Sequence, residues 1–351
     1  MSDWNNIKSK LDQVYNALQD EESKKLFDAK VQYMIDRDSE AYIDTIFELN
    51  EQYPKNWRCP EIENVLEDGQ KIIIYGCGHD GKISERVLGL CGYPIAYWCD
   101  SNKNIQGTYI NGRKVISPED LKSYEDHLVI IGSRRYEVEI RRRLFDVGFP
   151  TKNIFVFAYN QGIALCGKQY FDMFLPEDEE VFIDAGAYNG DSANDFLEWV
   201  GDRKYKVYAI EPLADMCEVI INKNIPHVEV VNCMVWNRKE DLPLLTNGRG
   251  SSMDNDNHEN IQGGGGAAID EIVGDEKVSF IKMDIEGAEL KALEGARECI
   301  LKYSPRLAIC IYHKAEDIYE IGNYILSLNP DYKLYIRHYT TCMWETVLYA
   351  I

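Results

Sequence analysis

Acidic residues and glycines in the second half of the chain follow apolar runs at a regular spacing. Asp184 closes one apolar run, and Gly186 and Gly190 come two and six positions later. Glu211 closes the next apolar run. Because the carboxyl ends of parallel strands meet at one edge of a sheet, Glu211 is expected beside the glycine turn, where a carboxylate can accept hydrogen bonds from a ribose diol.

A third acidic group follows a later apolar run. Asp284, Glu286 and Glu289 come directly after the run from Phe280 to Met283. Clustered carboxylates repel one another and are stabilised by a cation nearby. The ammonium and sulfonium groups of S-adenosylmethionine would supply that charge, and a divalent metal is the alternative. We favour the organic ligand and expect no bound metal.

These stretches resemble the FkbM-type methyltransferase family over about residues 176–351. The motifs that carry the resemblance are Phe182–Gly190, Ile210-Glu211-Pro212, Ile281–Glu289 and Ala292–Ala296. The resemblance implies an S-adenosylmethionine-dependent methyltransferase with a seven-stranded class I sheet. The residues that it places around the donor are Asp184, Gly186, Ala187, Tyr188, Asn189, Gly190, Glu211, Pro212, Asp284 and Glu286. One departure is the third strand, which ends at Asn232 without the acid that many such enzymes use on adenine.

Two histidines follow the later strands and are candidates for a catalytic base. His313 comes after the fifth apolar run and His338 after the sixth, and imidazole titrates in the range needed to accept a hydroxyl proton. Asp284 is the third candidate catalytic residue. A structural role is the alternative for either histidine. The expected acceptor is a hydroxyl group of a saccharide or related small molecule. Tyr339 or Trp344 could stack on its ring, although we expect Trp344 to pack in the core.

A second glycine motif lies in the first half of the chain. Gly76, Gly78 and Gly81 follow an apolar run in the G-x-G-x-x-G spacing, and Asp100 closes the next run. This pattern favours a nucleotide site, in which backbone N–H groups approach a pyrophosphate and the acid takes a ribose. A purely structural glycine turn is the alternative. The region also resembles the small Rossmann-like domains that accompany saccharide-biosynthesis enzymes, over Asp100–Asn102 and Ile110–Pro118.

This motif keeps two other functions open for the chain. One is an NAD(P)-dependent oxidoreductase, and the other is a non-catalytic protein that binds a nucleotide or nucleotide-sugar. The oxidoreductase would lack a partner catalytic domain, because the sequence downstream resembles the methyltransferase.

The periodicity of apolar residues predicts an α/β protein of four segments. Helical spacing predicts a lead-in over residues 1–68, and short apolar runs alternating with helical stretches predict a Rossmann-like parallel sheet of about four strands over 69–160. A connector over 161–178 leads to the methyltransferase domain over 179–351, whose last two strands are expected to form an antiparallel hairpin. The glycine-rich stretch from 247 to 266 is expected to be a loop or a substrate lid.

Charge and composition limit the partners. The chain has 351 residues and a formal charge of −21, which would repel a phosphate backbone and argues against nucleic acid. No apolar run is long enough to cross a bilayer, and the amino terminus lacks the pattern of a signal peptide. We therefore expect a cytoplasmic protein with reduced cysteines, in which a homo-oligomer is an open alternative.

Overall fold

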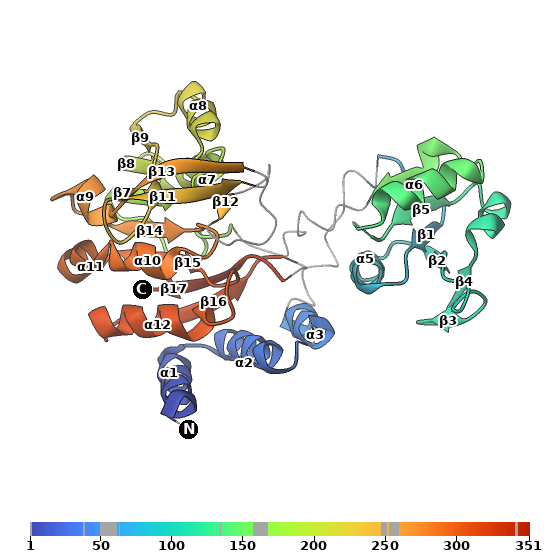
Figure 1. The fold of residues 1–351 in the computed structure, drawn as a ribbon, viewed down its shortest axis with the longest axis horizontal. Coiled ribbons are helices and arrows are strands. Elements are labelled where there is room, and N and C mark those ends of the chain that lie inside the picture. Colours follow the sequence, from blue (N-terminus) through green and yellow to red (C-terminus); the bar gives the residue numbers. More distant parts are fainter. Residues whose placement is uncertain are drawn as a thin grey trace. The chain divides into compact units, whose positions relative to one another are not determined.

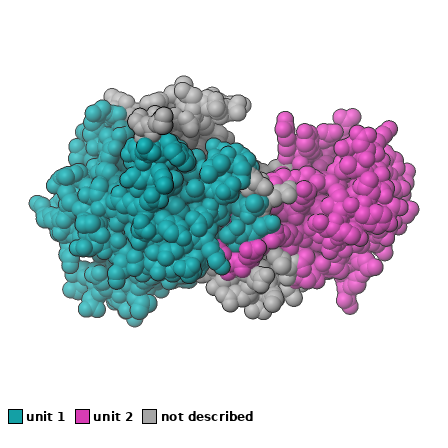
Figure 2. Space-filling view, turned by 90° about the horizontal axis from the view of Figure 1, so that it is seen from below, with its two compact units in different colours: residues 1–45, 167–339, 343–351 teal, residues 46–166, 340–342 magenta. Residues whose placement is uncertain are grey.

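The chain folds into two compact units. The structure is a computed structural model that describes residues 2–37, 39–49, 62, 64–133, 135–156, 168–246, 251–252, 260–340 and 343–351. The first unit contains residues 1–45, 167–339 and 343–351, and the second contains 46–166 and 340–342 (Figure 2). The second unit is therefore an insertion in the first. The connector expected over residues 161–178 is described only from residue 168 onward.

A seven-stranded sheet forms the centre of the first unit, with the order β16-β17-β15-β14-β7-β8-β9 (Figure 1). Its strands are β7 (Glu179–Ala185), β8 (Lys204–Ile210), β9 (Val228–Val231), β14 (Phe280–Met283), β15 (Arg306–Cys310), β16 (Leu334–His338) and β17 (Thr346–Ala350). Neighbouring strands are parallel except that β17 pairs antiparallel with both β15 and β16. The expected seven-stranded sheet with its terminal hairpin is confirmed.

The helices of this sheet follow its strands in the alternation that the apolar pattern predicts. They are α7 (Asp191–Val200), α8 (Ala214–Asn222), α9 (Ile269–Val273), α10 (Glu289–Glu294), α11 (Arg297–Tyr303) and α12 (Asp317–Leu328). The central strands β14 and β15 are buried at every position, as strands covered on both faces must be. None of the described helices is long and apolar enough to span a membrane.

The first helices of the chain pack on the far edge of this sheet. α1 (Ser2–Ala17) lies beside α12, and α2 (Glu21–Asp36) lies beside β16 (Figure 1). The backbone N–H of Gln19 donates to the carbonyl of Leu334 at 3.0 Å. The Arg337 guanidinium of β16 binds the Asp20 carboxylate at 2.6 Å. The predicted helical lead-in thus packs on the large sheet through α1 and α2, and α3 (Ser39–Leu49) is its third helix.

A four-stranded sheet replaces the loop expected between residues 247 and 266. Its order is β10-β13-β11-β12, where β10 is Met234–Val235, β11 Glu240–Thr246, β12 Ser251–Ser252 and β13 Asn260–Ala267. The expectation of a loop was wrong for the run Gly263–Gly266, which pairs antiparallel with β11 from Glu240 to Pro243. Backbone hydrogen bonds to a neighbouring strand hold the glycines there without side-chain packing. Residues 247–250 and 253–259 of the expected loop lie outside the described residues.

The second unit contains a six-stranded sheet in the order β3-β4-β2-β1-β5-β6. Its elements are β1 (Ile72–Tyr75), α5 (His79–Leu90), β2 (Ile95–Cys99), β3 (Tyr109–Ile110), β4 (Arg113–Ile116), the 3-10 helix η2 (Pro118–Ser123), β5 (Leu128–Ile131), α6 (Glu137–Asp146), the 3-10 helix η3 (Thr151–Asn153) and β6 (Ile154–Val156). The four expected strands are present and parallel. The short hairpin of β3 and β4 was not predicted, and Asn111 and Gly112 with positive φ form its turn.

We expect Arg337→Ala to destabilise the first unit by about 1 to 3 kcal/mol, because it removes a half-buried charge-assisted bond to Asp20 and leaves that acid unpaired. Urea unfolding followed by circular dichroism measures the change. Lys333→Ala, at an exposed residue directly before β16, is the control and should be nearly neutral. Equal stability of Arg337→Ala and the parent protein would show that the helices do not depend on this ion pair.

Candidate active site

The turn between β7 and α7 approaches the backbone of the neighbouring strand end. Gly186 has φ of 76°, and a Cβ atom there would lie 1.9 Å from the carbonyl oxygen of Asp284. Gly190 has φ of 81°, and a Cβ atom there would lie 3.2 Å from Ile220. The N–H groups of Gly186 and Ala187 both donate to the carbonyl of Ile210. The two glycines are therefore required by the fold of the turn.

A buried ion pair anchors this turn from below. Lys282 Nζ lies 2.9 Å from Asp184 Oδ1 and also donates to the carbonyl of Gly186 at 2.7 Å. Ser192 Oγ donates to Asp184 Oδ2 at 2.5 Å. Burial disfavours the Lys282 ammonium, but Asp184 and Asp284 outweigh it and raise its pKa above the ordinary value. Asp184 is fully buried, so we infer that it acts on the donor site through the turn that it holds.

Glu211 lies directly beside the glycine turn. Its Oε2 accepts the N–H of Tyr188 and its Oε1 accepts the N–H of Leu213, each at 2.9 Å. Burial raises the pKa of Glu211, and the two backbone bonds oppose that rise. Each oxygen keeps a further lone pair with which it can accept a ribose hydroxyl. The Asn232 amide nitrogen donates to the carbonyls of Glu211 and Pro212, which holds this side chain against the turn that follows β8.

The side chains at the apex of the turn differ in exposure. Tyr188 has φ of 46° and its side chain is about half exposed, at 49%. The Asn189 amide donates to Asp191 at 2.8 Å. Ala187 is buried. Of these three predicted donor contacts, Ala187 is closed to a ligand, whereas the Tyr188 side chain is exposed and the Asn189 side chain is partly exposed.

Asp284 receives two tyrosine hydroxyl groups at the end of β14. Tyr170 donates to Oδ2 at 3.1 Å and Tyr312 donates to Oδ1 at 3.0 Å. Burial raises the pKa of both phenols, so both remain hydrogen-bond donors at neutral pH. The carboxylate of Glu345 lies near Asp284, and burial together with that charge raises the pKa of Glu345.

His313 lies among three carboxylates. Its Nε2 is 3.5 Å from Asp284 and 3.6 Å from Glu286, and its Nδ1 is 2.9 Å from the fully buried Glu289. Burial disfavours the imidazolium, but Glu289, Asp284 and Glu286 outweigh it and raise the pKa of His313 to about 9. The structure thus brings together the predicted residues His313, Asp284 and Glu286. The positive charge that was expected beside these carboxylates comes partly from the imidazolium of His313.

A divalent cation would also suit this cluster. Ligand atoms of Asp284, Glu289 and His313 lie within 4.8 Å of one another, and so do those of Asp284, Cys310 and Glu345. Carboxylates and imidazole are ordinary ligands of transition metals. A metal therefore stays the alternative to the donor's ammonium group at this position.

His338 lies in a different environment from His313. It is 2% exposed, its Nδ1 is 2.8 Å from Thr346 Oγ1, and its ring meets the edge of the Tyr42 ring at 6.0 Å. These contacts are with β17 and α3. The geometry therefore favours His313 as the base.

Several residues of the site did not stand out in the sequence. Lys282 is a charged residue within an otherwise apolar strand, which was an available signal. Tyr312 precedes His313 and could have been included with it. Tyr170 and Glu345 come from the segments before β7 and before β17, and nothing in the local sequence marks them.

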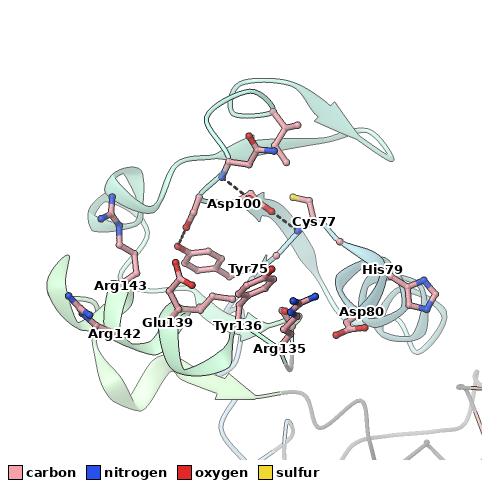
Figure 3. Close-up of a pocket in the computed structure, with 18 of the residues that line it drawn as sticks. Tyr75, Cys77, His79, Asp80, Asp100, Arg135, Tyr136, Glu139, Arg142 and Arg143 are labelled. Atoms are coloured by element: carbon pink, nitrogen blue, oxygen red, sulfur yellow. Dashed lines mark hydrogen bonds between the residues drawn. The ribbon is translucent and has the colours of Figure 1, made fainter. Parts of the chain in front are cut away.

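The glycine motif of the second unit lies at the mouth of a separate pocket. Gly76, Gly78 and Asp100 line this pocket, at the carboxyl ends of β1 and β2 (Figure 3). Asp100 accepts the backbone N–H groups of Cys77 and Asn102, each at 2.8 Å. Gly81 packs behind the motif, where a Cβ atom would lie 1.8 Å from the carbonyl oxygen of Gly76.

The strand order and the glycine turn of the first unit are those of a class I methyltransferase. Residues 184–339 match the family model of the methyltransferase FkbM domain, and residues 68–155 match that of the C2185-like N-terminal domain. Residues 184–339 of the larger unit are therefore a methyltransferase domain of the FkbM type, and S-adenosylmethionine is its methyl donor.

The solved structures that the chain is similar to are methyltransferases of low identity. A methyltransferase FkbM from Methylobacillus flagellatus KT is 21% identical, with 88% of this chain and 99% of that chain covered and a TM-score of 0.47. A SAM-dependent methyltransferase from Aquifex aeolicus is 22% identical, with 50% and 84% covered and a TM-score of 0.29. No curated protein matches the chain.

We expect Glu289→Gln to lower the pKa of His313 from about 9 toward about 7, because the nearest of its three carboxylates becomes neutral. Titration of the imidazole by NMR measures the shift. The raised pKa contributes stability that is fully present below about pH 6.5 and is lost as the pH rises through about 9, so the variant should lose stability on the acid side. Glu316→Gln, an exposed acid nearby, is the control.

We expect Glu211→Ala to weaken S-adenosylmethionine binding by about 1.5 to 3 kcal/mol, the cost of losing charge-assisted hydrogen bonds. Calorimetry measures the affinity, and thermal unfolding shows whether the loss of the Tyr188 and Leu213 bonds disturbs the fold. Glu218→Ala, exposed on α8, is the matched control. An unchanged dissociation constant in folded Glu211→Ala would remove this residue from the donor site.

Proposed function

We propose that the protein transfers the methyl group of S-adenosylmethionine to a hydroxyl oxygen of a saccharide or related polyol. The observation that carries the proposal is the position of His313, whose Nδ1 lies 2.9 Å from the buried Glu289 and whose Nε2 lies beside Asp284 and Glu286. This is a base oriented by one carboxylate and placed at the edge of the sheet where the glycine turn lies. A cytoplasmic location and a homo-oligomer remain predictions.

The chain's own residues would position the reactants and move one proton. S-adenosylmethionine, when bound, supplies an electrophilic methyl group on a sulfonium sulfur. Glu211 would hold the ribose, and Asp284 with Glu286 the ammonium group. Held in this way, the donor could give its methyl group to the acceptor oxygen and would be left as a neutral thioether. The hydroxyl proton passes to Nε2 of neutral His313 and then to solvent.

The raised pKa of His313 sets the pH dependence of this step. With a pKa of about 9, only about 1% of the imidazole is neutral at pH 7. If proton transfer limits the rate, the rate should rise with pH up to about 9 and then level off. A rate that is independent of pH over this range would point to Glu286 or to proximity alone.

An exposed aromatic ring beside the carboxylates supports a saccharide acceptor. The Trp344 side chain is 50% exposed, and its ring lies 6.3 Å from that of Tyr312. The Glu286 side chain, which lies 3.6 Å from His313, is 51% exposed. An aromatic face that covers the apolar side of a sugar ring, with carboxylates that accept its hydroxyl protons, suits a polyol. The expected core position of Trp344 was wrong.

The direct test is a methyl-transfer screen with labelled donor. Free saccharides, nucleotide sugars and other polyols are offered as acceptors, and the product is analysed for the atom that carries the label. Transfer to oxygen of a saccharide is expected. Parallel reactions with a chelator separate the alternative of a metal at Asp284, which predicts loss of activity and recovery on adding Mg²⁺ or Mn²⁺. Transfer to nitrogen or carbon only would contradict the proposal.

With an acceptor known, we expect His313→Ala to lower the single-turnover transfer rate about 100-fold or more, the usual contribution of a general base. Donor affinity should change little, because the ribose is held by Glu211. Lys314→Ala, the exposed neighbour, is the matched control, and His338→Ala tests the second histidine. Transfer by His313→Ala at the rate of the control would exclude it as the base.

A further inference from the structure

The second unit has a pocket that the methyltransferase reaction does not use. It is a cavity of about 1280 Å³ at the carboxyl ends of β1, β2 and β5 (Figure 3). The chain runs from β1 outward to β2 and β4 on one side, and then returns to β5 and β6 on the other. The pocket therefore lies where the strand order reverses, which is the place at which open parallel sheets bind ligands.

The three glycines of the motif at this pocket differ in whether the backbone requires a glycine. Gly76 has φ of 112°, and a Cβ atom on Gly81 would lie 1.8 Å from the carbonyl oxygen of Gly76, so the fold itself requires both. Gly78 has φ of −75°, and a Cβ atom there would meet nothing within 4 Å. The fold therefore does not need glycine at this position. A side chain at 78 would fill the pocket instead.

Gly78 also leaves the first turn of α5 open. It is the N-cap residue of a helix of 12 residues, and no side chain caps that helix. Serine, threonine, asparagine or aspartate is usual at an N-cap, because the side chain satisfies the first backbone N–H groups. A glycine that is not needed for conformation leaves the N–H groups accessible to an anion from the pocket.

The Asp100 carboxylate lies next to the start of this helix and is held by two backbone hydrogen bonds. Asp100 Oδ2 accepts the N–H of Cys77 and Oδ1 accepts the N–H of Asn102, so each oxygen has one lone pair still available. The two backbone bonds orient the carboxylate toward the cavity. This is an acceptor for a pair of neighbouring hydroxyl groups.

Cations and an aromatic ring line the remaining wall. Arg135 and Arg142 line the pocket, and no ion pair recorded among the described residues involves either of them. Arg143 is bound to Glu119, and the acids Asp80, Glu139 and Asp146 also line the wall. Tyr136 is 51% exposed, and its ring lies next to Arg135 (Figure 3). The pocket thus combines groups for an anion, a diol and a planar ring.

We propose that this pocket binds a nucleoside diphosphate, free or as the nucleotide part of a larger ligand. The diphosphate lies over Gly78 at the start of α5 and is bound by Arg135 and Arg142. The ribose hydroxyl groups donate to Asp100. The residues of this pocket are different from those of the methyl-donor site. A negative binding result would therefore leave the proposed methyl transfer unaffected.

The sharpest test changes Gly78 alone. Calorimetry on the full chain measures the binding of ADP, UDP, GDP, NAD⁺ and inorganic pyrophosphate. Gly78→Val places a side chain where the diphosphate would lie without straining the backbone, and we expect it to weaken binding at least about 10-fold. Gly89→Ala, on the same helix and also free of close contacts, is the matched control. Equal affinity in both variants would overturn the proposal.

A second pair of variants separates a specific contact from general charge. We expect Arg142→Ala to weaken binding about 10-fold, while Arg141→Ala, whose side chain binds Glu137 outside the pocket, leaves it unchanged. Competition with S-adenosylhomocysteine identifies the site occupied. Displacement of the nucleotide would place it in the donor site and refute the inference, as would the absence of binding by every nucleotide at millimolar concentration. The arms with NAD⁺ and the free diphosphates distinguish a dinucleotide from a mononucleotide ligand.

Discussion

The buried ion pair of Lys282 and Asp184 is the interaction on which the donor site depends. The two residues are direct partners in the pairing of β14 with β7, and both side chains are almost completely buried. A charge in such a position is strongly destabilising without its partner, by about 3 to 5 kcal/mol. Because Lys282 also bonds to the carbonyl of Gly186, the same interaction fixes the glycine turn against Asp284. Correct strand pairing and the shape of the donor site therefore form together.

The negative charge of the acidic group after β14, which is Asp284, Glu286 and Glu289, is also compensated by a cationic side chain, but less completely. His313 faces Asp284, Glu286 and Glu289, and only Glu289 is fully buried. Asp284 is also bonded by two tyrosines, while Glu286 is half exposed. A cationic ligand that enters here would meet carboxylates already oriented by hydrogen bonds, which lowers the cost of ordering them on binding.

The fold was predictable where one local pattern decides it, and the site only in part. Apolar runs located all strands of the large sheet, and Asp184, Glu211 and Asp284 were found because each closes a strand. The sequence marks Lys282 only as a charge in an apolar strand, and it does not mark Tyr170 at all. Because the acids that these two residues contact lie far from them in the sequence, only the tertiary structure shows the pairing. The dipeptide Asn111-Gly112 is a strong signal for a β-hairpin, although the hairpin of β3 and β4 was not predicted. Glycine is rarely found in strands, so the four glycines of β13 did not predict one. They form a strand because backbone hydrogen bonds to β11 hold them, without any contribution from side chains.

The packing of α1 on α12 and of α2 on β16 has a consequence for synthesis on the ribosome. Ser23 bonds to the backbone of Ile336, so the two segments that meet lie near opposite ends of the chain. The larger unit cannot close until its last strands have emerged, whereas the inserted unit has all its strands between residues 72 and 156. Domains generally fold as units during translation. The nascent chain should thus carry a finished inserted unit while the apolar faces of α1 and α2 wait for their partners, which makes those helices natural contacts for a chaperone.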